Sequence, residues 1–553
     1  MKLSRSLTLL GLGGFLSHAH ESTNSKPQQV AIIGAGAAGS SAAYHIRKFA
    51  AEANIPINVT IFERTDRVGG RTLTVAPYDD PSIAVELGAS IFIQLNHILW
   101  DAVHQFNLSL RVPGPDEDEL LAIWDGEGFV YQQDSSQYDW WNLAKLFWKY
   151  GLAPYRAQQL MKGTVAQFLK LYEAPNFPFR SLTTASYELN LTYFTALTGD
   201  QFLAQNNIDA RFAHDLIQAA TRVNYASNLD KIHGLETMVS IAPDGASQVA
   251  GGNWQIFAAM VKDSGASIRF NTSVDYIGLE SEREKQNTRS RYLIRTKPSD
   301  PAGQLSPNDA EPLVFDRVIL ANPYQFSNIE AGKDVLKQTI DEIPYVKLHV
   351  TLFTSPFRLS PEFFGLTPGT TAPTTVLTTL AEGEDGSSGV SGAGKAGFFS
   401  ISTLRTLKNP KTGSVEYLYK IFSPEKVTAE FLSSLLGVPV PETFTSPAKG
   451  EVHAQAVDPI SWIYPHVFHS YPKGLPRVTF QDPVLGDGLY YTSGIESFIS
   501  TMETSALMGK NVARLLIDDA VLSFGAAEKV GGAPTMPGPL DGDGQQAVLG
   551  GQD

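Results

Sequence analysis

The stretch QQVAIIGAGAAGSSAAYHIRKF, from Gln28 to Phe49, has the pattern of a strand, a glycine-rich turn and a helix. Four apolar residues, 30–33, precede the turn, and small or apolar side chains recur on one side of the helix that follows. The next segment, INVTIFE at 57–63, alternates as a second strand. Together these segments predict a βαβ unit with a right-handed crossover.

The turn itself has the spacing G-x-G-x-x-G, with Gly34, Gly36 and Gly39. Gly34 permits a tight turn, Gly36 lets the backbone approach a pyrophosphate, and Gly39 allows close packing of helix on strand. Glu63 ends the second strand, where an acidic side chain can bind ribose hydroxyls. This context favours a dinucleotide site over a glycine turn that is only structural.

Composition excludes several classes of function. The chain has 553 residues, enough for two or more domains, and a formal net charge of −14. That charge argues against nucleic-acid binding and gives no electrostatic help toward an anionic membrane. The absence of cysteine excludes disulfides, thiolate metal sites and iron–sulfur clusters, and the 11 histidines form no H-E-x-x-H motif. We therefore predict no metal site.

The first residues, MKLSRSLTLLGLGGFLSHAHE, have the three-part pattern of a secretory signal peptide. Basic Lys2 and Arg5 precede an apolar run at 7–16, and SHA precedes a cleavage point after Ala19. A short hydrophobic helix is the alternative. No run of about 18 apolar residues follows, so we expect no transmembrane helix. The sequence thus predicts the secretory pathway, with a secreted or a vacuole- or lysosome-like destination.

Four N-x-S/T sequons fit that route. We expect glycosylation at Asn107, Asn190 and Asn271. Asn58 opens an apparent buried strand, where a glycan would obstruct packing, so the other three are better candidates and Asn58 is not counted among the expected sites.

The distribution of strand-like and helix-like segments along the chain predicts an α/β fold with two interleaved domains. A Rossmann-like nucleotide-binding domain comprises residues 28–107, 231–341 and 485–520. Two excursions, 108–230 (helix-like) and 342–484 (strand-rich), form an α+β substrate domain with a mixed sheet and helices. We also expect a flexible surface loop at 381–397 and a disordered tail at 525–553, since both lack core-forming residues.

Two further segments resemble the glutathione-reductase-like flavoproteins of the amine-oxidase type. They are ERTDRVGGRTLT at 63–74 and ELGAS at 86–90. The resemblance implies FAD, with NAD as the weaker alternative, and Arg71 facing the pyrophosphate. The residues implied to bind FAD are Gly34, Ala35, Gly36, Ala38, Gly39, Glu63, Arg64, Gly70, Arg71, Gly88, Ala89, Ser90, Val274, Gly494, Ile495, Glu496 and Met502. A second G-x-G-x-x-G, GAGKAG at 392–397, lies in the predicted surface loop rather than between a strand and a helix, so we infer no nicotinamide site. Electrons would then pass to oxygen or another acceptor.

A wider resemblance, from about residue 29 to 516, is to the prenylcysteine oxidase family, also called prenylcysteine lyase. Its most specific parts are RVNYASN at 222–228, GLETMVSIA at 234–242 and YKIFS at 419–423. The resemblance implies FAD-dependent oxidation of a thioether. Hydride leaves the carbon bonded to sulfur, water adds, and the product collapses to cysteine and a prenyl aldehyde, while oxygen becomes hydrogen peroxide.

The resemblance leaves the catalytic residues unknown. Lys420, in YKIFS, could polarise water or oxygen near the flavin, or be a sheet lysine reaching toward solvent. Arg222 and Asn224 could hold the substrate carboxylate, with a structural salt bridge as the alternative for Arg222. Trp148, in the helix WWNLAKLFWKY, could line the mouth of a prenyl pocket or dip into a membrane surface. Otherwise that helix belongs to the core of the substrate domain.

Two other functions remain open from the residues alone. One is oxidation of an amine, an amino acid or another small metabolite by an enzyme of the same fold. The other is prenyl binding without flavin, as in proteins of the Rab escort type.

Overall fold

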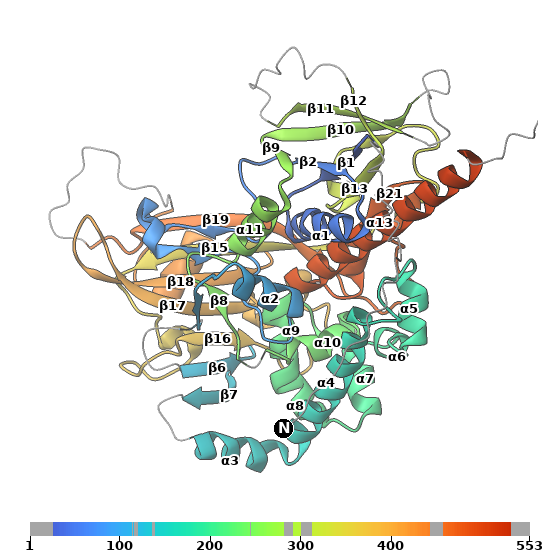
Figure 1. Cartoon of the computed structure of the whole chain (residues 1–553). Helices are drawn as coiled ribbons and strands as arrows, with labels where there is room; N and C mark the ends of the chain where they lie inside the picture. The colour runs from blue at the N-terminus through green and yellow to red at the C-terminus, as the bar shows by residue number, and fades with distance from the viewer. Residues whose placement is uncertain are drawn as a thin grey trace, which may run out of the picture.

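The computed structural model describes residues 26–112, 114, 120–134, 139–243, 245–280, 291–299, 312–442 and 457–531, without the side chains of 134, 139–143 and 523–531. The predicted signal peptide and the part of the predicted tail beyond residue 531 lie outside the described residues. A unit built around the glycine turn occupies the upper part of Figure 1, and a larger sheet with a group of helices lies below it.

A six-stranded sheet forms the centre of the upper unit. β1 pairs in parallel with both β2 and β13, so the first two strands are neighbours, as a βαβ unit requires. In spatial order the strands are β20 (Val484–Gly486), β21 (Leu489–Tyr491), β13 (Arg317–Leu320), β1 (Gln28–Ile33), β2 (Ile57–Phe62) and β9 (Ser267–Arg269).

Both faces of this sheet are covered, because alternate side chains of β1 belong to two different cores. Val30 and Ile32 pack in one core with residues of three helices: α1 (Ala37–Ala53), α11 (Trp254–Ser264) and α13 (Met502–Gly531). Ala31 and Ile33 pack in another core with residues of a four-stranded sheet. Its strands are β12 (Leu313–Phe315), β11 (Tyr292–Pro298), β10 (Thr272–Leu279) and β14 (Glu330–Ala331). Burial on both faces explains why residues 30–33 of β1 are all apolar.

A seven-stranded mixed sheet dominates the lower unit. Its order is β19 (Trp462–Pro472), β15 (Tyr345–Ser355), β18 (Val415–Ser423), β17 (Ser400–Lys408), β16 (Thr375–Thr378), β6 (Leu120–Trp124) and β7 (Phe129–Asp134). The last two strands come from the excursion predicted to be helix-like. β6 pairs with β16 on one side and with β7 on the other, which joins the two excursions in one sheet.

The first excursion forms a group of helices, most of which share a core with residues of β6 and β7. They are α3 (Asp139–Tyr150), α4 (Ala153–Leu169), α5 (Leu182–Glu188), α6 (Thr192–Thr195), α7 (Gly199–Gln205), α8 (Ala210–Phe212), a π-helix (Ala213–Ile217) and α9 (Gln218–Tyr225). The buried apolar residues of α5 pack instead in the core of the upper unit. α10 (Gly234–Ser240) contacts α4, α7 and α9. The predicted boundary at residue 231 therefore separates α10 from the helices on which it packs.

The remaining elements connect these layers. β3 (Thr74–Val75) pairs with β4 (Val85–Glu86), and β5 (Leu110–Arg111) pairs with β8 (Gln248–Val249). α2 (His97–Gln105) lies beside α13, and α12 (Ala429–Leu436) packs on the lower sheet. Among the described residues, no helix is both long enough and apolar enough to span a bilayer.

Two predictions about disorder are wrong. The segment 381–397 is ordered, with Ala393 fully buried and Ala396 5% exposed. The composition of the segment did not reveal this order, because much of the anchoring comes from backbone carbonyl groups that accept hydrogen bonds from distant side chains, as described below. The tail predicted from residue 525 begins too early, since α13 continues to Gly531.

Candidate cofactor and active site

The glycine turn joins β1 to α1. Gly34 has a φ of 106°, in the region that favours glycine. A Cβ on Gly39 would lie 1.9 Å from the carbonyl oxygen of Gly34, so helix and turn are in direct contact. α1 has no side-chain cap at Gly36 and no acidic residue in its first turn. Its first N–H groups therefore lack a capping side chain, as expected where a helix receives a phosphate.

Glu63 ties this turn to the end of β2. Its side chain is 6% exposed; Oε2 accepts the Ala35 N–H and Oε1 accepts the Thr65 N–H, each at 2.8 Å. A carboxylate oxygen can accept more than one hydrogen bond, so ribose hydroxyls can still bind there. Arg64, the next residue, is exposed.

Two buried polar atoms near the turn have no hydrogen-bond partner among the described residues. One is Nη1 of Arg67, whose Nη2 donates to the Gly70 carbonyl at 2.9 Å. The other is Oδ1 of Asn322, and a Cβ on Gly34 would lie 3.7 Å from the Cβ of Asn322. Because buried polar atoms are normally paired, both fit a polar ligand such as a dinucleotide. Sequence reasoning missed both, although Arg67 lies inside ERTDRVGG and Asn322 closely follows a strand.

Lys420 connects the lower sheet to the ELGAS segment. From β18 its Nζ donates to the Glu86 carbonyl at 2.8 Å and to Ser90 Oγ at 3.1 Å. The side chain is 8% exposed, and burial lowers the pKa of Lys420 to about 8, against the attraction of Glu86. An ammonium has three donors, so one remains for a further acceptor. Lys420 is thus a buried lysine close to the predicted flavin segment.

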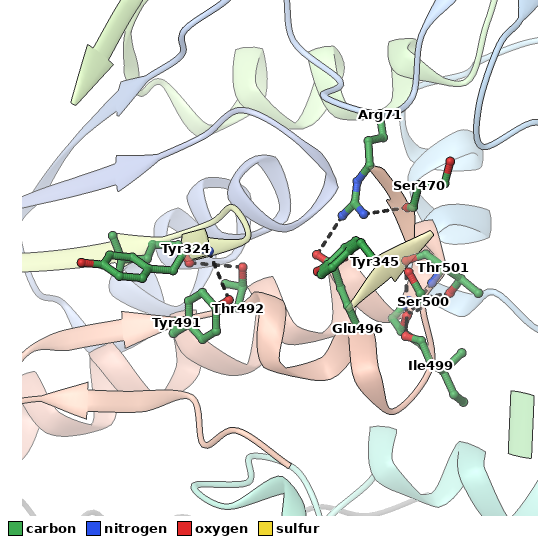
Figure 2. A network of polar contacts seen from close by, with 12 residues as sticks. Arg71, Tyr324, Tyr345, Ser470, Tyr491, Thr492, Glu496, Ile499, Ser500 and Thr501 are labelled. Carbon is green, nitrogen blue, oxygen red and sulfur yellow. Dashed lines mark hydrogen bonds and ion pairs between the residues drawn. The ribbon is translucent and has the colours of Figure 1, made fainter. Parts of the chain in front are cut away.

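Figure 2 shows a second contact between predicted cofactor residues. Arg71 Nη2 lies 2.8 Å from Glu496 Oε1, and Arg71 Nη1 donates to the Ser470 carbonyl at 2.8 Å. The Tyr345 hydroxyl donates to Glu496 Oε2 at 3.1 Å. The GGR and GIES segments, more than 400 residues apart in sequence, therefore meet at one ion pair beside a partly buried tyrosine.

The other predicted cofactor residues lie in the glycine turn, on α1, on β10, in the ELGAS and GIES segments and at the start of α13. Ala35 and Ala38 belong to the core beneath α1, and Val274 is 4% exposed between the two upper sheets. Ser90 Oγ donates to the Gly88 carbonyl at 2.7 Å, and the intervening Ala89 accepts a hydrogen bond from Asn253. Gly494 and Ile495 lie buried in a 3₁₀ turn (Ser493–Ser497), and Met502 begins α13.

Glu236 and His233 form a buried polar pair that sequence reasoning missed. Glu236 is 1% exposed, and its Oε1 accepts the Ser500 N–H at 3.1 Å, just before α13. Its Oε2 has no partner among the described residues and lies 3.8 Å from His233 Nε2. Burial raises the pKa of Glu236 to about 8, so the carboxyl group is largely protonated at neutral pH. The signal was a single acidic residue in the otherwise uncharged segment GLETMVSIA.

The two residues predicted to hold the substrate carboxylate are engaged elsewhere. Arg222 is fully buried and makes five hydrogen bonds, to Thr378 Oγ1, Asn228 Oδ1 and the carbonyls of Gly392, Ala393 and Phe398. It anchors the 381–397 segment, so its role is structural, through neutral acceptors rather than a salt bridge. Asn224 donates to the carbonyls of Ala220 and Ser240 at 3.0 and 3.1 Å.

Trp148 does not belong to the core. Its side chain is 92% exposed, and the preceding Phe147 is 60% exposed. The alternative that α3 is a core helix is therefore wrong at these positions. Figure 1 shows α3 at the lower margin of the molecule.

The sequons lie on the surface. Asn107, Asn190 and Asn271 are exposed, each in a turn with a φ between 51° and 53°. Asn58 is also exposed, so the burial argument that excluded it is wrong. Among the described residues no cluster of three or more His, Asp or Glu side chains could hold a metal ion.

Comparisons with known families give two matches. A family model described as prenylcysteine lyase matches residues 133–527, and one described as an NAD(P)-binding Rossmann-like domain matches residues 32–106. The second match covers the glycine turn, Glu63 and Arg71. The first covers Lys420, Glu496 and the Glu236–His233 pair.

Similar proteins extend over most of the chain. A farnesylcysteine lyase from Arabidopsis thaliana is 29% identical, over 89% of this chain and 88% of its own. Prenylcysteine oxidase 1 from Homo sapiens is 27% identical, over 88% of each chain. Among solved structures, cyclohexylamine oxidase from Brevibacterium oxydans has a TM-score of 0.52 at 15% identity, covering 90% of this chain and all of its own. At that identity the likeness concerns the fold alone.

Proposed function

The chain belongs to the prenylcysteine lyase family, and we propose that it is an FAD-dependent oxidase that cleaves a prenylated cysteine thioether. The observation that carries the proposal is similarity to a farnesylcysteine lyase over 89% of the chain, together with the family match at 133–527. The overall reaction consumes the thioether, water and oxygen, and releases cysteine, a prenyl aldehyde and hydrogen peroxide.

FAD is the cofactor that best suits the glycine turn and the segments around it. The uncapped start of α1 and the unpartnered Nη1 of Arg67 suit phosphate groups, and Glu63 suits ribose hydroxyls. Arg71 and Glu496 would border the middle of the cofactor. Bound FAD would supply the oxidation of the carbon next to sulfur and the transfer of the electrons to oxygen.

The residues of the chain would orient the reactants and exclude water. Lys420 holds Ser90 and the Glu86 carbonyl in place and keeps one donor for a water or oxygen molecule at the reacting end. Lys420 is 8% and Glu236 1% exposed, so little bulk solvent would reach either side chain.

The test is a peroxide assay on the purified full-length protein. Farnesylcysteine and geranylgeranylcysteine are compared with free cysteine, primary amines and amino acids, while aldehyde and cysteine release are followed separately. We expect equal amounts of peroxide and aldehyde from the prenylated substrates only. Peroxide from amines alone would replace this proposal by the amine-oxidase alternative. Absence of flavin absorption, even after FAD is added, would favour a prenyl-binding protein.

We also propose passage through the secretory pathway. The exposed positions of Asn107, Asn190 and Asn271 support this, because a glycan there would not displace buried side chains. Enzymatic deglycosylation should increase the electrophoretic mobility of the protein from its native host. Replacing each Asn by Gln should remove the difference stepwise, and no change in mobility would contradict the proposal.

A further inference from the structure

Four large apolar side chains lie exposed where α3 turns into α4. Trp148 is 92%, Tyr155 62%, Phe147 60% and Leu152 53% exposed. We refer to these four residues as the α3–α4 elbow. They fall within nine consecutive positions at the lower margin of Figure 1. Exposed apolar side chains at this density mark an interaction surface more often than isolated ones do.

The residues beside the elbow are anchored to the protein. Directly after Trp148, Lys149 Nζ lies 3.0 Å from Asp215 Oδ2, and the Tyr150 hydroxyl donates to the same oxygen at 2.8 Å. Tyr150 is 5% exposed, and its ring packs edge-on against Phe212 at 5.4 Å. The end of α3 is thus fixed by a buried carboxylate in the π-helix. The aromatic side chains face solvent from an anchored backbone.

The local charge differs in sign from that of the whole chain. Between Asp139 and Glu173 the sequence has five basic residues and no acidic one, although the chain as a whole carries a net charge of −14. Arg156, Lys162 and Lys170 of this segment are exposed. Aromatic residues flanked by cations are typical of helices that lie at the surface of an anionic bilayer.

The inner side of α4 continues from the elbow toward the candidate active site. Ala157, Met161, Val165 and Phe168 are all less than 10% exposed. The Phe168 ring lies 6.3 Å from that of Phe498, which directly follows the GIES turn. With 17 residues, α4 spans about 25 Å. One helix therefore joins the exposed apolar surface to the cofactor segment along a buried apolar side.

We propose that the α3–α4 elbow binds the surface of an anionic lipid bilayer, with Phe147 and Trp148 at the level of the headgroups and the basic residues of α4 beside acidic lipids. This placement would bring the protein to the phase in which a prenylated substrate dissolves. This advantage for reaching the substrate rests on the proposed function, whereas the binding to the bilayer does not.

The experiment is flotation of the full-length protein with vesicles of phosphatidylcholine alone or with phosphatidylserine, without substrate. We expect binding to the mixed vesicles, and at least 10-fold weaker binding for the double variant F147S/W148S. The double variant R156E/K162E should lose the preference for phosphatidylserine. Y187S is the matched control, because Tyr187 is 73% exposed on α5, outside the elbow, and it should bind as the unmodified protein does. Unchanged thermal melting and flavin absorbance exclude misfolding of the variants.

Three results would overturn the inference. The first is that the unmodified protein binds neither kind of vesicle. The second is that F147S/W148S binds as well as the unmodified protein, and the third is that Y187S loses as much binding as F147S/W148S. If F147S/W148S instead converts a dimer to a monomer without any vesicle binding, the elbow is a contact between two copies of the chain. Because no substrate is present, vesicle binding can succeed when the peroxide assay fails, and the reverse.

Discussion

Replacing Glu236 by Gln tests whether the buried carboxyl group is protonated. Its Oε1 accepts one hydrogen bond, from the Ser500 N–H, and its Oε2 has no partner among the described residues. Burial raises the pKa from the ordinary 4.5 to about 8, while the Ser500 N–H acts in the opposite direction. Glutamine resembles the protonated acid in shape but cannot titrate. The substitution therefore removes the pH dependence of this one group.

The sign follows from proton binding in the two states. Between pH 4.5 and 8 the folded protein holds a proton at Glu236 that the unfolded chain has lost, so stability falls as pH rises. Each pKa unit corresponds to about 1.4 kcal/mol, so the full penalty is on the order of 5 kcal/mol above pH 8. Between pH 5 and pH 7 the free energy of unfolding of E236Q should rise by roughly 2 to 3 kcal/mol relative to the unmodified protein.

The measurement is denaturant unfolding of both proteins at pH 5, 6, 7 and 8. Groups that titrate identically in both proteins cancel in the difference. E188Q is the control for the substitution itself, since it makes the same change at an exposed position. A difference for E236Q that stays constant between pH 5 and 7, or changes in the opposite direction, would show that Glu236 is ionised and refute the reasoning.

Three further predictions concern single positions. G39A should abolish flavin binding, because its Cβ would lie 1.9 Å from the Gly34 oxygen; G163A, in an open part of α4, should retain flavin. R222M should lower the free energy of unfolding by about 3 kcal/mol or more, since five buried acceptors lose their donor, and R222K should not restore it; urea unfolding measures both. K420M should lower peroxide formation about 100-fold while flavin content stays unchanged; loss of flavin instead would contradict a role at the reacting end.

Sequence determined the parts of this protein that depend on short-range spacing. The order strand, glycine turn, helix, strand can be predicted from residues 28–63 alone, because it depends on the spacing of apolar residues and glycines within that segment. Gly39 acts through a contact with the carbonyl oxygen of Gly34, only five residues away. Composition likewise excluded thiolate chemistry, because it counts residues without needing their positions. The family resemblance rested on motifs spread along the chain, and the family match agrees with it.

Only the tertiary structure decided the partners and the burial of the polar and aromatic residues outside the glycine turn. Lys420 meets Ser90 across 330 positions and Glu236 meets Ser500 across 264, so no local pattern pairs them. Arg222 is structural because distant backbone carbonyls surround it, and those carbonyls also order a segment whose composition indicates flexibility. Trp148 has a large aromatic side chain of the kind usually found in a core, yet that side chain is exposed. A side chain's burial and partners depend on which distant segments the fold brings to it, and that information is absent from the residues beside it in sequence.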